Sequence, residues 1–520
     1  MDILLHKLDG LINGVIEGFD RIVFKGTLKP IAYAAGMAVF LGRINVLNKE
    51  YKNWAENQSK AIVGYAEQYA FNQSEIKIQY LPSYRIRKEE VAHKQQAASG
   101  IQSGLVGVWS CVESCKTYHA VYDKNAGFPQ LQHKNSRCKH LYFYYDHEDF
   151  GFMSIRLQTW APYEIQIALN GREWLRRQLD KAGIKYVVVG NKFLHIDDYD
   201  KAQSLLAAQL DTRWIDVLDR LAAEVFPSMR EIFGEHFGYT WILWQSEWAK
   251  DYIFSDPQSL DPIMNNVTRH AFLTGTYDRI LGYMGRPLSP NGQPHHASKP
   301  DLRTRCKKWH NGARIRHYLD DNSVKLYNEQ NVLRFEFTMN NPAKFRVYRT
   351  VEGRNDGEKK FLPMRKGIAD INVRTQICSA RLKNFTEHLA TFRDDTSFGD
   401  LISMVSKPVT AAGKRHRALD ITGKDRELLL AIADPKYNAD AITNKHLQGA
   451  LSNTEWTNGL TGKQLSGRIS RNLRLLREHR LIKKLPNQHR YMLTEKGRLL
   501  TIALSQLLGV KINDLTQLVA

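Results

Sequence analysis

The sequence lacks the features that mark secreted and membrane proteins. Five cysteines among 520 residues are few and odd in number, which argues against a disulfide scaffold and for a reducing compartment. No uninterrupted apolar run reaches the ~18–20 residues that a membrane-spanning helix needs. The start, MDILLHKLDG, has neither the long apolar core nor the small-residue cleavage site of a secretory signal. We therefore expect a soluble cytoplasmic protein without a membrane partner.

Several enzyme motifs are missing too. There is no P-loop and no G-x-G-x-x-G sequence, so nucleotide hydrolysis and dinucleotide chemistry are not expected, and neither HExxH nor a Ser-His-Asp set is present. Acidic residues are scarce, since 54 Asp and Glu face 74 Lys and Arg and give a net charge of +20. This excess favours polyanions through phosphate neutralisation and counterion release. DNA is the expected partner, with RNA as a further one.

The chain is too long for one hydrophobic core, because single cores stop growing near ~250–300 residues. With 43% hydrophobic and 25% charged residues, it has the composition of a globular protein. We expect a multidomain α+β fold, in which a mixed α+β body with an antiparallel sheet precedes a C-terminal winged helix-turn-helix. The predicted divisions are an N-terminal α/β region (1–130), a central ββαββα region (131–212), a helical insertion (213–300), a basic β-rich region (301–406), a basic linker (407–423) and a winged-helix DNA-binding domain (424–520).

One stretch of the predicted body combines aromatic density with strand alternation. Runs at 141–145 and 152–160 flank an acidic turn, which predicts an antiparallel hairpin. Because side chains alternate along a strand, Arg156 and Gln158 share its polar face. Such a face beside aromatic residues suits phosphate contact or base stacking, and a polar face that is merely solvated is the alternative. A helix is expected to follow at 163–181.

A tryptophan-rich segment lies in the predicted helical insertion. Trp241, Trp244 and Trp248 are spaced by three and four residues, which indicates one packed face of a helix rather than a binding cage. Glu247 and Asp251, four residues apart, would point in the same direction on that helix.

The segment after residue 300 is β-like and basic. In the run 332–339, Arg334 and Glu336 lie on one face, where a guanidinium and a carboxylate can reach the same groove. A structural cross-strand ion pair is the favoured alternative. The nucleic-acid contacts predicted on the body are Arg156, Gln158, Arg346 and Arg349.

Candidate catalytic residues are three carboxylates and one tyrosine. Asp20 and Glu113 stand at strand ends and Glu336 on a strand, and converging carboxylates would hold Mg²⁺ or Mn²⁺, which neutralises phosphate charge and activates the attacking group. Tyr327 is the candidate nucleophile of a reaction that passes through a phosphotyrosine bond. Whether these carboxylates and Glu247 meet in space decides between an enzyme and a binding protein.

A second metal hypothesis concerns Cys111, Cys115, Cys138 and His140. Thiolates and an imidazole are zinc ligands, and the first spacing falls within the usual range, although the second pair is closer than usual. Ordinary buried thiols are the favoured interpretation.

The C-terminal region has the most specific pattern. Helices are predicted at 424–433, 444–451 and 462–479, followed by a basic hairpin at 481–494, which is the order of a winged helix. Arginines recur every third residue of the third helix and spiral across its outer face, where they can track a groove and its phosphates. A solvated charged face is the alternative. The predicted DNA contacts are Arg468, Arg471, Arg474, Arg477, Arg480, Lys483, Lys484 and Arg490, with Lys414 and Arg415 in the basic linker.

Several of these segments also carry a family resemblance. FDRIVFKGTL, CKHLYFYY, RLQTWAPY, QSEWAKD and PMRKGIAD, with the terminal winged helix, resemble a large family of uncharacterised bacterial proteins often labelled hypothetical or MarR-like, and this implies no particular activity. KLYNEQNVLRFE is similar to rolling-circle replication initiators and related phage initiators, which carry a Tyr-Asp-Lys step followed by Arg-x-Glu on adjacent strands. Here Asn328 and Glu329 replace the Asp and the Lys.

Two functions follow from the sequence. The first is a nucleic-acid enzyme of a mobile element, a metal-dependent nuclease, nickase or transposase-like protein. The alternative is a non-catalytic DNA-binding regulator or nucleic-acid-binding scaffold. The sequence defines neither a target nor an oligomeric state.

Overall fold

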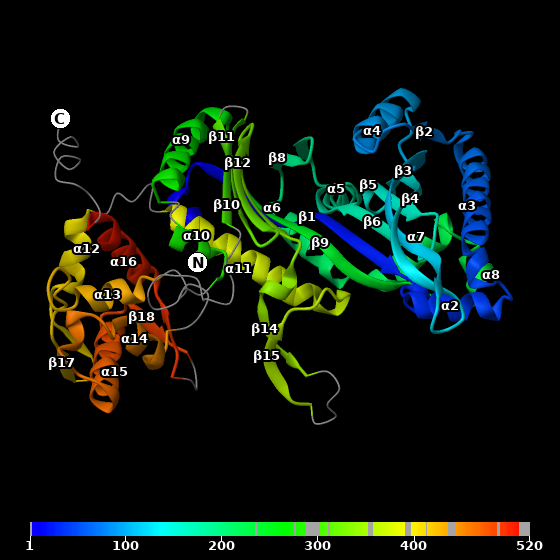
Figure 1. The fold of residues 1–520 in the computed structure, drawn as a ribbon. Helices are drawn as coiled ribbons and strands as arrows, with labels where there is room; N and C mark the ends of the chain where they lie inside the picture. Colours follow the sequence, from blue (N-terminus) through cyan, green and yellow to red (C-terminus); the bar gives the residue numbers. More distant parts are fainter. Residues whose placement is uncertain are drawn as a thin grey trace. The chain divides into compact units, whose positions relative to one another are not determined.

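The computed structural model shows a mixed α+β protein (Figure 1). As predicted, its helices and strands are combined in an α+β fold. The part of the chain that the structure describes comprises residues 3–234, 237–274, 277–286, 302–309, 312–351, 357–390, 397–411, 413–434, 442–485 and 489–508.

Eleven strands form one mixed sheet in the order β10-β11-β12-β13-β9-β1-β6-β5-β4-β3-β2. Strand β2 runs parallel to β3, whereas β1–β6, β3–β4, β4–β5, β5–β6, β10–β11 and β11–β12 are antiparallel pairs. The bounds are β1 Ile12–Thr27, β2 Gln79–Leu81, β3 Gly104–Asp123, β4 Phe128–His147, β5 Gly151–Gln158, β6 Ile165–Asn170, β9 Thr240–Phe254, β10 Leu302–Trp309, β11 Gly312–Leu319, β12 Asn322–Glu329 and β13 Val332–Met339.

The chain divides into two compact units. The first comprises Met1–Val15, Lys250–Phe337 and Gln376–Ala520, and the second comprises Ile16–Ala249 and Thr338–Thr375. Strands β1, β9 and β13 each contribute residues to both units.

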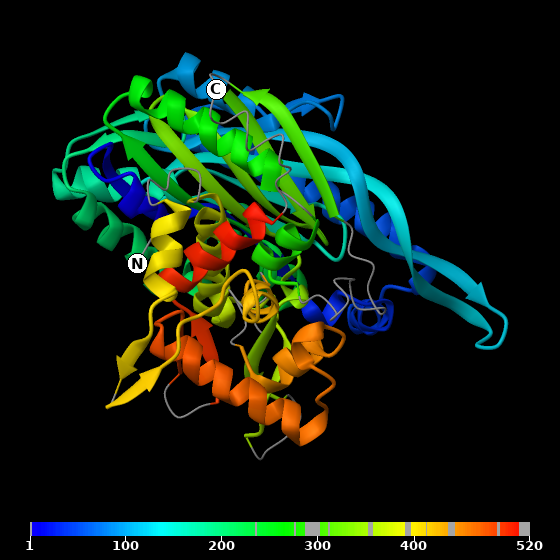
Figure 2. The same cartoon turned by 90° about the vertical axis from the view of Figure 1, so that its left-hand side faces the viewer.

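The predicted hairpin of the second unit is confirmed. Strands β4 and β5 are antiparallel, with Tyr142 opposite Arg156. Met153, Ile155 and Leu157 are buried and alternate with more exposed residues, as a strand with one face on a core requires. Strands β3 and β4 run on together as a long two-stranded ribbon (Figure 2).

The helix predicted at 163–181 is only partly correct, because its first residues form strand β6. In β6 the buried residues alternate with half-buried ones, which is the period of a strand rather than of a helix. The helix begins at Gly171, where the side chain of Asn170 accepts hydrogen bonds from the N–H groups of Arg172 and Glu173 at 2.8 and 3.2 Å. It ends before Gly183, as predicted.

The remaining elements of the second unit are mostly helices and small hairpins. They are α2 Ala34–Arg43, α3 Tyr51–Ser74, α4 Lys88–Ser99, α5 Gly171–Ala182, β7 Tyr186–Val189, β8 Lys192–Ile196, α6 Tyr199–Ala208, α7 Trp214–Val225, α8 Met229–Phe233, β14 Arg346–Thr350 and β15 Lys359–Pro363.

The tryptophan-rich segment is a strand, β9, and the prediction of a helix there is wrong. Its three indoles do not share a face. Trp241 donates to Asp219 at 2.7 Å and Trp248 to Glu17 at 2.8 Å, while Trp244 is exposed. The aromatic and β-branched residues of the segment favour an extended chain, and they outweigh the helical spacing of the tryptophans.

The described residues of the first unit from 397 onward contain five α-helices and two two-stranded hairpins (Figure 1). The predicted buried stripe of Ile469, Leu473 and Leu476 is confirmed. The hairpin turn at 486–488 lies outside the described residues. The elements are α12 Phe398–Val405, β16 Val409–Ala411, β17 Lys414–His416, α13 Arg426–Ile432, α14 Asn444–Leu451, α15 Gly462–Glu478, β18 Ile482–Lys484, β19 Tyr491–Leu493 and α16 Glu495–Leu507.

Much of the segment predicted as an exposed basic linker is folded. Strands β16 and β17 pair within it, and Leu419 and Ile421 are buried in the same apolar core as α13 and α15. Apolar burial therefore extends upstream of the predicted module.

The other described helices are α1 Ile3–Lys7, α9 Pro257–Thr274, α10 Tyr277–Tyr283 and α11 Ile371–Leu389.

Candidate metal centre

Three carboxylates come together on neighbouring strands of the sheet. Asp20 is on β1, Glu247 on β9 and Glu336 on β13, and one oxygen from each lies within 4.8 Å of the others. Asp20 is 8% exposed and Glu336 2% exposed. Opposite ligands of an octahedral Mg²⁺ with ~2.1 Å bonds are ~4.2 Å apart, so a small inward movement would let the three oxygens share one ion. We name Asp20, Glu247 and Glu336 the acidic triad. Two of its members, Asp20 and Glu336, were predicted as catalytic carboxylates.

Glu336 is the most buried member of the acidic triad. The ammonium of Lys325 contacts its carboxylate, and the hydroxyl of Tyr327 donates to its Oε2 at 3.3 Å. Burial alone would raise the pKa of Glu336, but attraction and hydrogen bonding from Lys325, with the nearby charge of Arg334, hold that pKa below its ordinary value. Glu336 is therefore anionic at neutral pH.

Arg334 and Asp251 form a separate buried ion pair. The guanidinium donates to both carboxylate oxygens, at 2.5 and 2.7 Å, and both side chains are 1% exposed. The cross-strand ion pairs that the sequence favoured for Arg334 and Glu336 are therefore present: Arg334 pairs with Asp251 of β9, and Glu336 pairs with Lys325 of β12. A bidentate guanidinium already neutralises Asp251.

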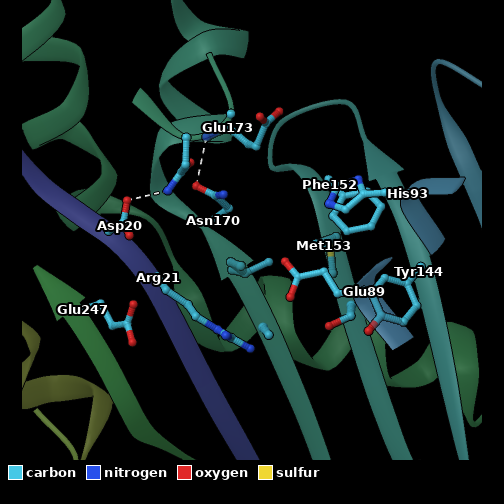
Figure 3. Close-up of a pocket in the computed structure, with 15 residues that line it drawn as sticks. Asp20, Arg21, Glu89, His93, Tyr144, Phe152, Met153, Asn170, Glu173 and Glu247 are labelled. Carbon is cyan, nitrogen blue, oxygen red and sulfur yellow. Dashed lines mark hydrogen bonds between the residues drawn. The ribbon is translucent and has the colours of Figure 1, made fainter. Parts of the chain in front are cut away.

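Asp20 and Glu247 also line a pocket of about 400 Å³ in the second unit (Figure 3). The side-chain amide of Asn191 donates to Asp20. On the other side of the pocket, the ring of His93 from α4 stacks on Phe152 of β5 with centroids 3.8 Å apart, and the ring of Tyr144 from β4 lies 5.5 Å from that of Phe152. The pocket therefore joins carboxylates to an aromatic wall.

Arg21 supplies a cation to the same pocket. It follows Asp20 on β1, lines the pocket and is exposed (Figure 3). Its guanidinium forms no ion pair or hydrogen bond with any of the residues that the structure describes. A phosphate in the pocket would therefore find a guanidinium that is not already neutralised.

The prediction that Glu113 joins the other catalytic carboxylates is wrong. It lies on β3, four strands from β1 in the sheet order, and is not a member of the acidic triad. Its carboxylate accepts hydrogen bonds from Lys88 at 2.6 Å, Tyr142 at 2.6 Å and Arg156 at 3.2 Å. Burial would raise the pKa of Glu113, but these donors hold it below its ordinary value, so Glu113 is a structural ion-pair partner.

The same contacts change the interpretation of Arg156 and Gln158. Arg156 is partly exposed but is already paired with Glu113. Gln158 is 4% exposed, and its amide donates to the carbonyls of Lys116 and Trp160 at 3.1 and 2.8 Å. Gln158 is thus a buried structural residue, and its prediction as a nucleic-acid contact is corrected.

The residues considered for zinc do not meet as a ligand set. Cys111 is opposite His140 on β3 and β4, whereas Cys115 is opposite Ser136 and Cys138 is opposite Glu113. All four side chains are buried, and burial lowers the pKa of His140 to about 4. Within the described ranges, the acidic triad is the one group with metal-ligand spacing. Buried thiols are what the structure shows.

Tyr327 lies beside the acidic triad. Strands β12 and β13 are neighbours, so Tyr327 and Glu336 have the adjacent-strand placement that the initiator resemblance implies. The Tyr327 ring packs edge-on against Trp309 with centroids 5.8 Å apart. Its hydroxyl already contacts a carboxylate that can accept a proton.

Most of the predicted basic contacts of the C-terminal part are exposed. Arg468 is half-buried, with its guanidinium over the Trp456 ring at 4.5 Å, and Arg477 pairs with Glu478 at 2.7 Å. Arg490 is half-buried as well. The residues with exposed side chains are Arg471, Arg474, Arg477, Arg480, Lys483, Lys484, Lys414 and Arg415.

Arg346 and Arg349 lie on the β14–β15 hairpin. Arg346 donates to the carbonyl of Phe361 at 2.6 Å, and Arg349 to that of Pro363 at 3.1 Å. Both guanidiniums therefore have one edge bound to the neighbouring strand.

Sequence reasoning placed Glu247 on a helix and did not predict the pocket. The alternation of burial along 240–249 is visible only in the structure, and the sequence signal for a strand was the aromatic-rich apolar run of residues 241–244. Among the described helices, none is long and apolar enough to span a bilayer. No protein-family model, curated protein or solved structure matches this chain.

Proposed function

We propose that this protein is a metal-dependent enzyme that cleaves or transfers phosphodiester bonds of nucleic acid, as a nuclease, nickase or transposase-like protein of a mobile element does. The observation that carries the proposal is the acidic triad of Asp20, Glu247 and Glu336. Mg²⁺ or Mn²⁺ is the cofactor that suits three carboxylates, since both ions prefer oxygen ligands. The net charge of +20 supports a polyanionic substrate.

Hydrolysis of a phosphodiester bond would use both the acidic triad and Arg21. Asp20, Glu247 and Glu336 would hold the ion, which when bound would neutralise charge on the scissile phosphate and polarise it. A water molecule loses a proton to a carboxylate and forms a new P–O bond, while the bond from phosphorus to the leaving sugar oxygen breaks and that oxygen takes up a proton. Arg21 would bind a phosphate oxygen in the pocket, where its guanidinium can stabilise charge that develops in the transition state.

A tyrosine nucleophile is the second form of this mechanism. Tyr327 would give its phenolic proton to Glu336, with which it is hydrogen-bonded at 3.3 Å, and its oxygen would form the P–O bond in place of water. The product would be a phosphotyrosine linkage and a free sugar hydroxyl. Denaturing electrophoresis of protein with labelled DNA distinguishes the two forms, because only the second leaves a covalent adduct that Tyr327→Phe abolishes.

Cleavage assays with labelled single- and double-stranded DNA and RNA in Mn²⁺ test the proposal. We expect cleavage that EDTA abolishes and that Asp20→Asn, Glu247→Gln and Glu336→Gln each reduce at least ~100-fold, an effect of ~2.7 kcal/mol on the barrier. Glu113→Gln is the matched control and should retain most activity. The proposal fails if the wild-type protein cleaves no substrate, or if the triad variants cleave as fast as Glu113→Gln.

The exposed arginines of α15 favour a second function, a DNA-binding regulator or scaffold with a winged helix. Helices α13, α14 and α15 followed by the β18–β19 hairpin have the order of that fold. Asn444 ties α14 to α15 by donating to the Ser466 carbonyl at 2.8 Å, and this fixes the helix that would enter the groove. If the protein is such a regulator or scaffold, the acidic triad takes no part in catalysis.

The double variant Arg471→Ala/Arg474→Ala tests the winged helix. Both side chains are exposed, so the substitutions should leave the fold intact and weaken duplex binding at least ~10-fold. Lys424→Ala/Arg426→Ala, at the start of α13, changes the net charge by the same amount and is the control. Equal duplex binding by the two double variants would exclude α15 as the DNA-reading helix.

A further inference from the structure

A second basic surface lies on strands β10, β11 and β12 (Figure 1). Cations stand at alternate positions of β10 and β11 and at the facing position of β12, so their side chains project from one face of the sheet. We name this surface the cationic face. Its members are Arg303, Arg305 and Lys307 of β10, Arg314 and Arg316 of β11, and Lys325 of β12.

The strand register places like charges directly opposite each other. Arg305 is opposite Arg316, and Lys307 is opposite Arg314. In the next pair of strands, Arg316 is opposite Lys325. Like charges in such positions repel and destabilise a sheet, so this arrangement needs a reason other than the stability of the isolated chain.

Carboxylates relieve only part of this repulsion, through the contact between Lys325 and Glu336. Of the residues that the structure describes, none forms an ion pair with Arg305, Lys307, Arg314 or Arg316. Charges on an outermost strand also prevent edge-to-edge pairing, and β10 is the outermost strand in the order. That role accounts for β10, but not for the matching cations on β11 and β12, which already have neighbours on both sides.

Aromatic rings lie among these cations. The guanidiniums of Arg303, Arg305 and Arg316 lie 5.6, 5.5 and 4.3 Å from the centre of the Tyr318 ring. Arg314 lies 4.3 Å from the Trp309 ring. Cations that track a phosphate backbone and rings on which bases stack are the two components of single-strand binding surfaces. A duplex would use the cations and leave the rings without bases to stack on.

The cationic face leads to the acidic triad. Arg305, Arg316 and Lys325 lie in one row across β10, β11 and β12, and Lys325 contacts Glu336. The row from β10 to β13 crosses three strand spacings, or ~14 Å at ~4.8 Å each. A polyanion lying along the row would therefore reach the carboxylates.

We infer that the cationic face binds single-stranded nucleic acid, with its phosphates on the arginines and lysines and its bases on Tyr318 and Trp309. The delivery of that strand to Glu336 rests on the proposed function, but the binding itself does not. The substrate class of the enzyme is then a single strand, or a duplex locally opened to one.

Fluorescence anisotropy with a labelled single-stranded oligonucleotide and the full chain tests the inference. The measurement uses EDTA in place of Mn²⁺, so that cleavage does not interfere. We expect Arg305→Ala/Arg316→Ala to weaken single-strand binding at least ~10-fold and to lower the slope of log K against log salt by ~1.4, since each phosphate contact with a single strand contributes ~0.7. Tyr318→Leu should weaken binding and leave the salt slope unchanged, because stacking releases no counterions.

Two variants serve as controls. Arg305→Lys/Arg316→Lys keeps both charges and should recover most of the affinity, which would show that the loss in the alanine variant is not caused by misfolding. Arg43→Ala/Lys60→Ala removes two exposed cations from α2 and α3 and should bind as the wild-type protein does.

The outcomes separate this inference from the proposed function. Unchanged single-strand affinity and salt slope in Arg305→Ala/Arg316→Ala would overturn the inference, even if the protein cleaves nucleic acid. An equal loss for the matching duplex, with no effect of Tyr318→Leu, would overturn the single-strand assignment. If the wild-type protein cleaves nothing but shows the expected binding pattern, the inference is supported and the proposed enzyme is not.

Discussion

Replacing Lys325 by methionine tests how the acidic triad is neutralised. Methionine keeps much of the length and apolar volume of lysine but removes the ammonium that contacts Glu336. Glu336 is 2% exposed, so its charge has little access to water. Removing one partner of a buried ion pair costs ~3–5 kcal/mol. Because the Lys325 side chain is 13% exposed, we expect the loss in Lys325→Met to lie at the lower end of this range. Without metal, the unfolding free energy should fall by ~3 kcal/mol.

A divalent ion should restore most of this stability. An ion that binds the folded protein at 100 times its dissociation constant adds ~2.7 kcal/mol, and in Lys325→Met no ammonium competes for Glu336. The assay is urea unfolding followed by tryptophan fluorescence, with and without Mn²⁺. Lys308→Met, on an exposed side chain of β10, should change stability by less than ~0.5 kcal/mol.

Two results would refute this reasoning. If Lys325→Met without metal is as stable as the wild-type protein, Lys325 does not compensate a buried charge. If the variant is destabilised but Mn²⁺ restores no more stability to it than to Lys308→Met, the three carboxylates do not bind the ion.

Three further predictions concern stability. Arg334→Met leaves Asp251 buried without its bidentate partner and should cost ~3–5 kcal/mol in urea unfolding, and a smaller loss than that of Lys308→Met would contradict the buried pair. Burial lowers the pKa of His140 and His317 to about 4, so the unfolded chain binds more protons between about pH 4 and 6.5 and stability should fall there by up to ~1.4 kcal/mol per histidine and pH unit as pH decreases. Urea titrations from pH 7 to 5 check this, and a flat profile would refute it. A Cβ at Gly171 would lie 2.1 Å from a backbone oxygen of β1, so Gly171→Ala should lower the thermal midpoint by several degrees, and an unchanged midpoint would show that helix α5 can shift.

Local patterns allowed several features to be predicted from sequence. The β4–β5 hairpin follows from alternation on both sides of a turn, and the buried stripe of α15 follows from helical spacing. Asp20 and Glu336 were identified because each carboxylate belongs to an apolar strand, although Asp20 and Glu113 lie inside β1 and β3 and not at the strand ends that were predicted. These patterns involve only residues close together in the chain, so they can be recognised in a single sequence.

The errors have different physical causes. Three tryptophans at helical spacing hid the strand β9, because their spacing was given more weight than the strand preference of the tryptophans themselves and of Ile242. Glu113 was grouped with Asp20 because both lie on strands, but the order of strands in a sheet depends on long-range pairing that local pattern does not encode. Gln158 was predicted to be exposed because the alternation of side chains shows on which face of the strand a residue lies. It does not show whether another part of the chain covers that face.

Titration of Mn²⁺ into the full chain by calorimetry tests the central claim most directly. We predict saturable binding of one ion per chain in the wild-type protein and in Glu113→Gln, and at least ~10-fold weaker binding in Glu247→Gln, which removes a charge of the acidic triad and leaves the contact between Lys325 and Glu336 in place. No binding to the wild-type protein, or equal binding by Glu247→Gln and Glu113→Gln, would contradict a metal centre on these three strands.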